Sequence, residues 1–329
     1  MKKLTKILTL ALAGAIVSAS ALAFASCGSD KKTVAIMKFG SFGSLNDCEE
    51  GILKGLAEQG INKDEYKIEQ YDSNFDSSIA TSQAQTLVNK GVDVIVSIAT
   101  PCAVAAANAS NGDVPVVYCA VTDDNNMNAY TNVCGTSDIP DYDLTLKMVT
   151  TVMGKEDLTI GVLRYVNEGS DAAMVDAMKT AAEAYTDMSI VDYTINDMTT
   201  LSSVVANQTQ TVDCFVNILD STIVGELQTI LEESTVPVFG SEIQQVKEGC
   251  IASVSYDYVE QVGKVAGEMA AKILKGEKKT ADLGKVRFKM PEYTPALYYN
   301  PTIVSEYDLT GNIPETIEGI IVQSTQSLA

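Results

Sequence analysis

The sequence contains no histidine, and this absence removes the usual general base of Ser–His and Cys–His catalysis and the commonest transition-metal ligand. It also lacks a P-loop, a G-x-G-x-x-G pattern at a first strand end and an EF-hand-type calcium loop. The paired carboxylates Asp123 and Asp124 are adjacent and therefore point in different directions, unlike a glycosidase pair. We expect a protein that is not an enzyme and that uses no metal or cofactor.

Basic residues are scarce: 23 lysines and arginines stand against 43 aspartates and glutamates, for a formal net charge of -20. Such an acidic surface repels phosphate backbones, which argues against nucleic acid as a partner. Apolar residues make up 46% of the 329 residues, so the chain is globular and long enough for two domains.

Residues 1–26 are typical of an export signal, with a basic start, an apolar run and small residues before Cys27. In one interpretation Cys27 is lipidated and becomes the mature N-terminus, with 27–32 as a tether. The alternative is ordinary secretion, because Ala23-Phe24-Ala25 also satisfies the small-x-small rule. We favour the lipoprotein, which would be anchored outside the cytoplasmic membrane through its lipidated cysteine.

Six further cysteines follow: Cys48, Cys102, Cys119, Cys134, Cys214 and Cys250. No Cys-x-x-Cys occurs, and several of these cysteines lie within apolar runs, where cysteine behaves as a small hydrophobic residue. We expect mostly free, buried thiols.

The same α/β unit occurs twice in the chain. The segments Thr33–Phe39, Val92–Pro101 and Val114–Tyr118 recur in the same order as Thr159–Tyr165, Val212–Ser221 and Val236–Gly240. Two similar lobes in one chain usually face each other across a cleft. The repeat therefore favours ligand binding between lobes.

Strands and helices alternate throughout this repeat. Apolar runs predict strands at Val34–Met37, Ile68–Tyr71, Val92–Ile98, Val114–Ala120, Ile160–Tyr165, Ile190–Thr194, Cys214–Leu219 and Val236–Phe239. Helices are predicted at Asp47–Gly60, Ser77–Lys90, Pro101–Ser110, Asp171–Thr186, Thr199–Thr209 and Thr222–Glu233. The pattern predicts an α/β fold of two similar doubly wound parallel-sheet lobes joined by a hinge. Lobe one would comprise 33–140 plus the hinge and returning tail 256–329, and lobe two 141–255.

Polar residues follow the predicted strands, where open parallel sheets bind ligands. The candidate ligand-binding residues are Ser41, Phe42, Asn74, Thr100, Thr122, Asp123, Asn167, Glu168, Ser170, Asp220, Thr222, Ser241, Glu242 and Tyr256. Thr100, Ser170 and Thr222 could hold a carboxylate at helix starts, and Asp123, Glu168 and Asp220 an ammonium group. Aromatic residues such as Phe39, Phe42, Tyr165 and Tyr256 could enclose a side chain. Each of these residues alone is equally consistent with a helix cap or a core position.

These motifs resemble the ABC-transporter substrate-binding lipoprotein family typified by tryptophan- and tyrosine-type receptors, which has a type I periplasmic-binding fold. The resemblance covers nearly all of 33–312 and is carried by Tyr71–Asn74, Ile98–Pro101, Ala120–Asp123, Asp220–Thr222 and Phe239–Glu242. It implies ligand contacts at Asn74, Thr100, Thr122, Asp123 and Asp220. The chain departs from the family pattern at 167–170 and at Ser221.

The leading hypothesis is a monomeric receptor that delivers an amino-acid-like ligand to ABC permease and ATPase subunits by hinge closure. An aromatic amino acid is the first choice of ligand, before other amino acids and nucleosides. A sensory receptor for a membrane kinase is the alternative, and a secreted enzyme is a more distant one.

Overall fold

Six parallel strands form the first sheet, in the order β11-β5-β4-β3-β1-β2. These strands are β1 (Thr33–Lys38), β2 (Lys67–Asp72), β3 (Val94–Ile98), β4 (Val116–Cys119), β5 (Val133–Thr136) and β11 (Lys285–Val286). Every residue of β3 and β4 is buried, as expected for β-branched strands that helices cover on both faces. The computed structural model describes residues 31–166, 171–287 and 293–328. The residues expected to form an export signal, 1–26, lie outside the described residues, as do Cys27, Asn167, Glu168 and Ser170.

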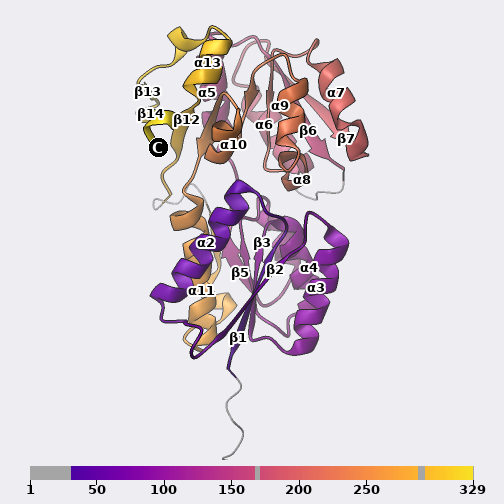
Figure 1. Ribbon diagram of the computed structural model, residues 1–329, viewed down its shortest axis with the longest axis vertical. Coiled ribbons are helices and arrows are strands. Elements are labelled where there is room, and N and C mark those ends of the chain that lie inside the picture. The colour runs from indigo at the N-terminus through magenta and orange to yellow at the C-terminus, as the bar shows by residue number, and fades with distance from the viewer. Residues whose placement is uncertain (1–30, 167–170, 288–292, 329) are drawn as a thin grey trace, which may run out of the picture. The chain divides into compact units, whose positions relative to one another are not determined.

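Two pairs of helices cover this sheet, one pair on each face (Figure 1). They are α2 (Gly43–Glu58) with α11 (Lys264–Leu274), and α3 (Ser77–Lys90) with α4 (Thr100–Ser110). Shorter elements are η1 (Asp124–Ala129), the π-helical η3 (Tyr258–Gly263) and α12 (Thr280–Leu283). We call this sheet and these helices the first lobe.

The second sheet repeats the first, with four parallel strands in the order β7-β6-β8-β9. Its strands are β6 (Thr159–Tyr165), β7 (Ser189–Ile195), β8 (Cys214–Val216) and β9 (Val238–Phe239). Its helices are α5 (Tyr142–Met153), α6 (Asp171–Ala182), η2 (Met198–Thr200), α7 (Leu201–Gln208), α8 (Ser221–Val224), α9 (Leu227–Glu233) and α10 (Ile243–Glu248). The matching order β2-β1-β3-β4 confirms the predicted repeat and the doubly wound α/β fold. The single helix predicted at Thr222–Glu233 is instead split into α8 and α9 at Gly225.

The C-terminal tail adds a further sheet in the order β10-β12-β14-β13. Its elements are β10 (Ala252–Ser255), β12 (Ala296–Tyr299), α13 (Pro301–Glu306), η4 (Thr310–Asn312), β13 (Thr316–Ile317), β14 (Ile320–Ser324) and η5 (Thr325–Leu328). Leu297 and Val304 pack in the same core as Ile160 of β6, so the tail belongs with the second lobe. This corrects the expected return of all of 256–329 to the first lobe: only the segment through β11 returns.

Three connections join the lobes: β5 to α5, β10 to η3, and β11 to β12. The first of these, 137–141, contains the buried residues Ser137 and Asp138. Six cysteines of the described part are free and buried, as predicted. In the described ranges, no helix has both the length and the apolar character needed to cross a bilayer.

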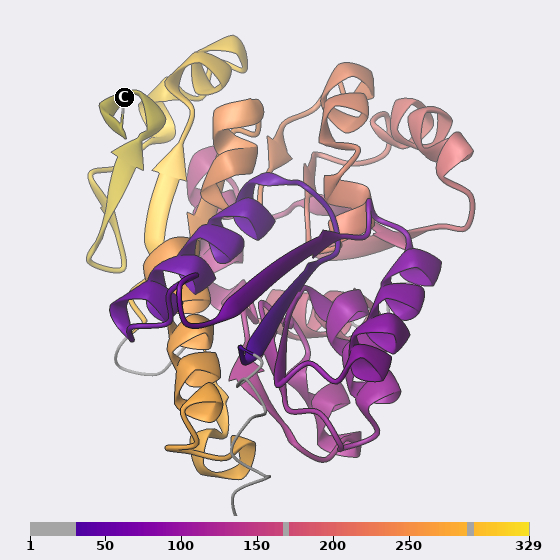
Figure 2. The ribbon, with the colours of Figure 1, turned by 60° about the horizontal axis from the view of Figure 1, so that its bottom comes forward.

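Helix α2 crosses η3 and α11, which follow one another along the chain (Figure 2). Glycines lie where these helices are closest. A Cβ atom built on Gly263 would lie 2.3 Å from the carbonyl oxygen of Cys48. One built on Gly55 would lie 2.2 Å from the carbonyl oxygen of Lys264. Glycine is therefore required at both positions, and this contact explains why the segment after β10 packs on the first lobe.

Candidate functional site

Two small adjacent hollows lie where residues of the two lobes meet, near the carboxyl ends of the parallel strands. The central hollow is lined by Phe42, Ser44, Leu45, Ala99, Thr100, Ala120 and Thr122 of the first lobe and by Leu219, Ser221, Val224 and Gln245 of the second. The hinge hollow is lined by Asp141, Tyr142, Thr145, Asn217, Ser241, Val254, Tyr256 and Tyr258, among others. Asp138 and Leu219 line both hollows, so the two are neighbours.

Each hollow is small in this structure. The space open to the centre of a water-sized sphere is about 20 Å³ in the central hollow and about 10 Å³ in the hinge hollow. Space of that size holds about one water molecule. The lobes also touch directly, because Gln244 Nε2 of α10 donates a hydrogen bond to Asp47 Oδ2 of α2 at 3.4 Å. In this structure neither hollow has room for a ligand much larger than a water molecule.

Strained backbone lines the central hollow at the ends of β3 and β4. Ala99 has φ 73° and Ala120 has φ 54°, both in the region that residues other than glycine rarely adopt. Such strain concentrates at functional sites, where the surrounding structure holds it in place. The segments Ile98–Pro101 and Ala120–Asp123, which carry the resemblance described above, each include one of these alanines.

Two long helices begin at the central hollow without a side-chain cap. No side chain caps the start of α2, which follows Phe42, or that of α4, which follows Ala99. By contrast, Asp76 caps α3 and Asp141 caps α5. The first backbone N–H groups of a helix have no partner within the helix and attract anions. The two uncapped starts therefore make the central hollow suitable for a carboxylate.

Asp138 is a buried carboxylate between the two hollows. Its Oδ2 accepts a hydrogen bond from the Tyr258 hydroxyl at 3.4 Å, and the Thr122 side chain also donates to this carboxylate. Burial raises the pKa of Asp138 to about 6, and the hydrogen bonds from Thr122 and Tyr258 oppose this rise. Its Oδ1 has no hydrogen-bond partner among the described residues.

Five of the predicted site residues line the two hollows: Phe42, Thr100, Thr122, Ser241 and Tyr256. Asn74 and Thr222 instead line an open groove beside Phe39 and Tyr165. Ser41 is exposed, and its hydroxyl donates to Asp72 Oδ2 at 2.7 Å. The structure thus brings together about a third of the predicted set.

The predicted carboxylates Asp220 and Glu242 are buried helix caps. Asp220 Oδ1 accepts from the N–H groups of Thr222 and Ile223 at 2.9 Å, and its Oδ2 accepts from that of Tyr165 at 2.5 Å. Glu242 accepts from the N–H groups of Gln244 and Gln245, while burial raises its pKa to about 8. Neither residue lines the two hollows. The ammonium role expected for Asp220 therefore has no geometric support.

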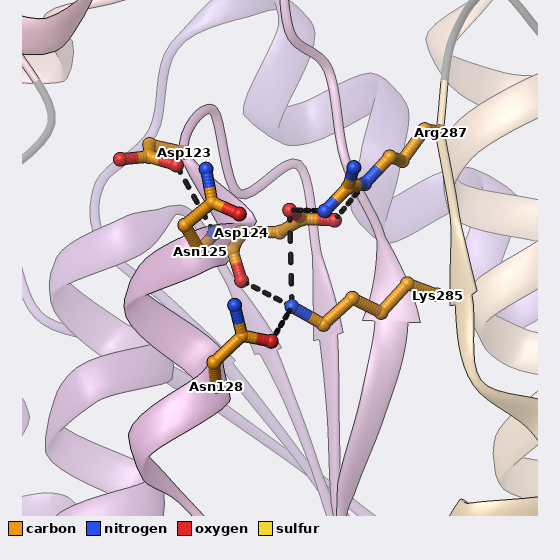
Figure 3. Close-up of polar contacts among 6 residues, drawn as sticks. All are labelled: Asp123, Asp124, Asn125, Asn128, Lys285 and Arg287. Atoms are coloured by element: carbon orange, nitrogen blue, oxygen red, sulfur yellow. Dashed lines mark hydrogen bonds and ion pairs between the residues drawn. The ribbon is translucent and has the colours of Figure 1, made fainter.

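The adjacent pair Asp123 and Asp124 serves the framework of the first lobe (Figure 3). Asp123 accepts from the Asn125 N–H at 3.0 Å and caps η1. The fully buried Asp124 binds Arg287 through two hydrogen bonds of 2.6 and 2.8 Å. Lys285 Nζ donates to the Asp124 carbonyl at 2.5 Å, so this cluster ties the third connection between the lobes to η1.

Replacing Asp124 by asparagine is expected to lower the free energy of unfolding by about 2 kcal/mol, because buried hydrogen bonds to charged groups are lost. The melting temperature should fall by about 5 °C. Asp123→Asn is the matched control, since asparagine caps a helix as well as aspartate does. Thermal unfolding of both variants measures the difference. Equal melting temperatures would contradict the stabilising role assigned to the Asp124 contacts.

Three residues that line the hinge hollow were not predicted from the sequence: Asp138, Tyr142 and Asn217. The first two lie at the boundary between the lobes, where we expected only a connection, and Asn217 lies within a predicted strand. Asn217 could have been recognised from the sequence, because it places a polar amide inside an otherwise apolar run.

Comparisons with known proteins agree with this architecture. A family model described as "ABC transporter substrate binding protein" matches residues 33–319. A tyrosine-binding protein of Clostridioides difficile is 28% identical over 258 residues, which cover 75% of this chain and 74% of that protein. A solved ABC domain in complex with L-Trp, from Streptococcus pneumonia, is 28% identical with a TM-score of 0.78, covering 85% of this chain and 95% of that one. A conserved domain protein from Vibrio cholerae, 24% identical, shares the fold with a TM-score of 0.81 over 90% of this chain and 99% of that one.

Proposed function

The chain belongs to the family of ABC transporter substrate-binding proteins, and from this premise we propose that it captures an amino acid between its lobes for an ABC importer. The observation that carries the proposal is the pair of hollows lined by both lobes at the carboxyl ends of parallel strands. Family members and structural neighbours are solute-binding proteins rather than enzymes. The protein therefore binds and releases its ligand without changing it.

An aromatic amino acid is the proposed ligand. Two relatives support this class, each 28% identical to this chain. One is named a tyrosine-binding protein, and the other was solved in complex with L-Trp. The central hollow offers Phe42, Leu45 and Leu219 to an apolar side chain and the uncapped starts of α2 and α4 to a carboxylate. The lining residues of both hollows include no lysine or arginine, which disfavours acidic side chains.

Closure of the lobes about their connections would enclose the ligand. The direct contact between Gln244 and Asp47 and the small size of the hollows support a closed conformation here. The permease and ATPase subunits would receive the ligand from a form in which the lobes have closed around it. Cys27, after the export signal, would anchor the protein outside the cytoplasmic membrane by its lipid.

Thermal unfolding with a panel of amino acids, sugars and nucleosides tests the proposal. L-tyrosine or L-tryptophan at about 100 times its Kd should stabilise the protein by about 2.7 kcal/mol. A shift with a sugar or a nucleoside, and none with any amino acid at millimolar concentration, would overturn the proposed ligand class.

A further inference from the structure

We propose that Asp138, Asn217 and Tyr142 form the seat of the ligand's ammonium group, an inference that rests on the proposed function above. All three side chains line the hinge hollow. Each has a buried polar atom that lacks a hydrogen-bond partner among the described residues: Asp138 Oδ1, Asn217 Oδ1 and the Tyr142 hydroxyl. Buried polar atoms are nearly always paired, so three unpaired ones around one hollow indicate a missing polar group.

The chemistry of these three atoms selects a cation with several N–H donors. Carboxylate and amide oxygens only accept hydrogen bonds, and a phenol oxygen can accept one. A primary ammonium group offers three donors and one positive charge, which matches three acceptors that include a carboxylate. No lysine or arginine lines the hinge hollow to take that place. A ligand carboxylate, in contrast, would meet a like charge there.

Neighbouring contacts hold two of the three groups in position. Tyr258 donates to Asp138 Oδ2, which leaves Oδ1 for the ligand. Asn217 Nδ2 donates to Gln245 Oε1 at 3.1 Å, which leaves the amide oxygen of Asn217 as the available acceptor. Asp138 lies in the first connection between the lobes, whereas Asn217 follows β8 of the second lobe. An ammonium group held by both would link the hinge to the second lobe.

Three other carboxylates close to the hollows already have hydrogen-bond partners. Asp141, which also lines the hinge hollow, accepts from the Leu144 N–H at 3.2 Å and caps α5. Asp220 and Glu242 are saturated by backbone N–H groups, as described above. Asp138 also lines the central hollow. There the uncapped starts of α2 and α4 would bind the carboxylate of the ligand, which is adjacent to the ligand's ammonium group.

The ionisation of Asp138 gives the seat a dependence on pH. The titratable groups that act on it are Tyr142 of α5, Tyr258 of η3 and Cys48 of α2, and burial raises the pKa of each, so all three are neutral near pH 7. Asp138 has a pKa of about 6, so below that pH it is mostly protonated. It must then lose its proton before it can bind an ammonium group. Affinity for the amino acid should therefore fall by about tenfold per pH unit below pH 6 and stay level between pH 7 and 8.

Calorimetric titration with L-tryptophan, tryptamine and indole-3-propionate tests the seat, since the second ligand lacks the carboxylate and the third lacks the ammonium group. Asp138→Asn should weaken binding of L-tryptophan and tryptamine about 100-fold and leave binding of indole-3-propionate unchanged or tighter. The affinity of the Asp138→Asn variant for L-tryptophan should also no longer decrease when the pH is lowered below 6. Asp123→Asn, outside both hollows, is the control with the same chemical change.

The outcomes separate this inference from the proposed function. If the unchanged protein binds no amino acid, including L-tyrosine, the proposed function fails. If it binds L-tryptophan and Asp138→Asn binds all three ligands as before, or loses all three equally, only the seat is wrong. If Asp138→Asn does not fold, Tyr142→Phe replaces it, because it removes only the hydroxyl. That variant should lose about tenfold in affinity for L-tryptophan and none for indole-3-propionate, and equal losses would overturn the seat.

Discussion

Replacing Gly263 by alanine is expected to lower the melting temperature by about 10 °C. The added Cβ would lie 2.3 Å from the Cys48 carbonyl oxygen and 2.9 Å from the Cys48 Cα atom, both backbone atoms that cannot rotate away. Helix α2 and the η3–α11 segment must then separate, at a cost of about 3 kcal/mol. The loss should be large because this contact attaches the returning helix to the core of the first lobe, where Ile52 and Ala266 pack.

Gly311→Ala is the matched control for this substitution. A Cβ atom on Gly311 would meet nothing within 4 Å. Thermal unfolding followed by circular dichroism should show the unchanged protein and Gly311→Ala melting together, well above Gly263→Ala. If Gly263→Ala melts with them, the two helices do not pack as closely as the structure shows.

Replacing Gly43 by leucine is expected to weaken ligand binding about 100-fold while leaving the fold intact. A Cβ atom on Gly43 would lie 2.5 Å from both Cβ and Cγ of Gln244, which belongs to the other lobe. A leucine there obstructs closure and spares the core of each lobe. The chain contains no tryptophan, so the fluorescence of added L-tryptophan reports its binding without interference from protein indole.

A second substitution distinguishes obstructed closure from local damage. In the background of Gly43→Leu, Gln244→Gly removes the atoms that the leucine meets and should recover most of the lost affinity. If Gly43→Leu binds normally, the lobes do not close at this contact. If the pair binds no better than the single variant, the damage lies within the first lobe.

The framework could be predicted from the sequence wherever local features decide it. The helix Ser77–Lys90 has the predicted bounds because Asp76 caps its start and Gly91, with φ 70°, ends it. The repeated strands were predictable because buried parallel strands are continuous apolar runs. The position of the tail was not, since β12 pairs with β10 across more than forty residues and no local pattern specifies that partner.

The candidate site was harder to predict because caps and ligand contacts use the same residue types. Asp220 and Asp138 are both buried aspartates near strand ends, yet only Asp220 faces backbone N–H groups that satisfy it. That difference depends on where the connection between the lobes passes, which sequence periodicity does not encode. Thr100 and Thr122 could be predicted to lie near the hollow because each follows a recognisable strand of the first sheet.

The most direct test of the account is a crystal structure of the protein purified from its cells without refolding, so that a bound ligand is retained. We predict one aromatic amino acid between the lobes, with its ammonium group against Asp138 and its carboxylate at the starts of α2 and α4. A sugar or nucleoside in the same place, or an amino acid bound away from Asp138, would contradict the account.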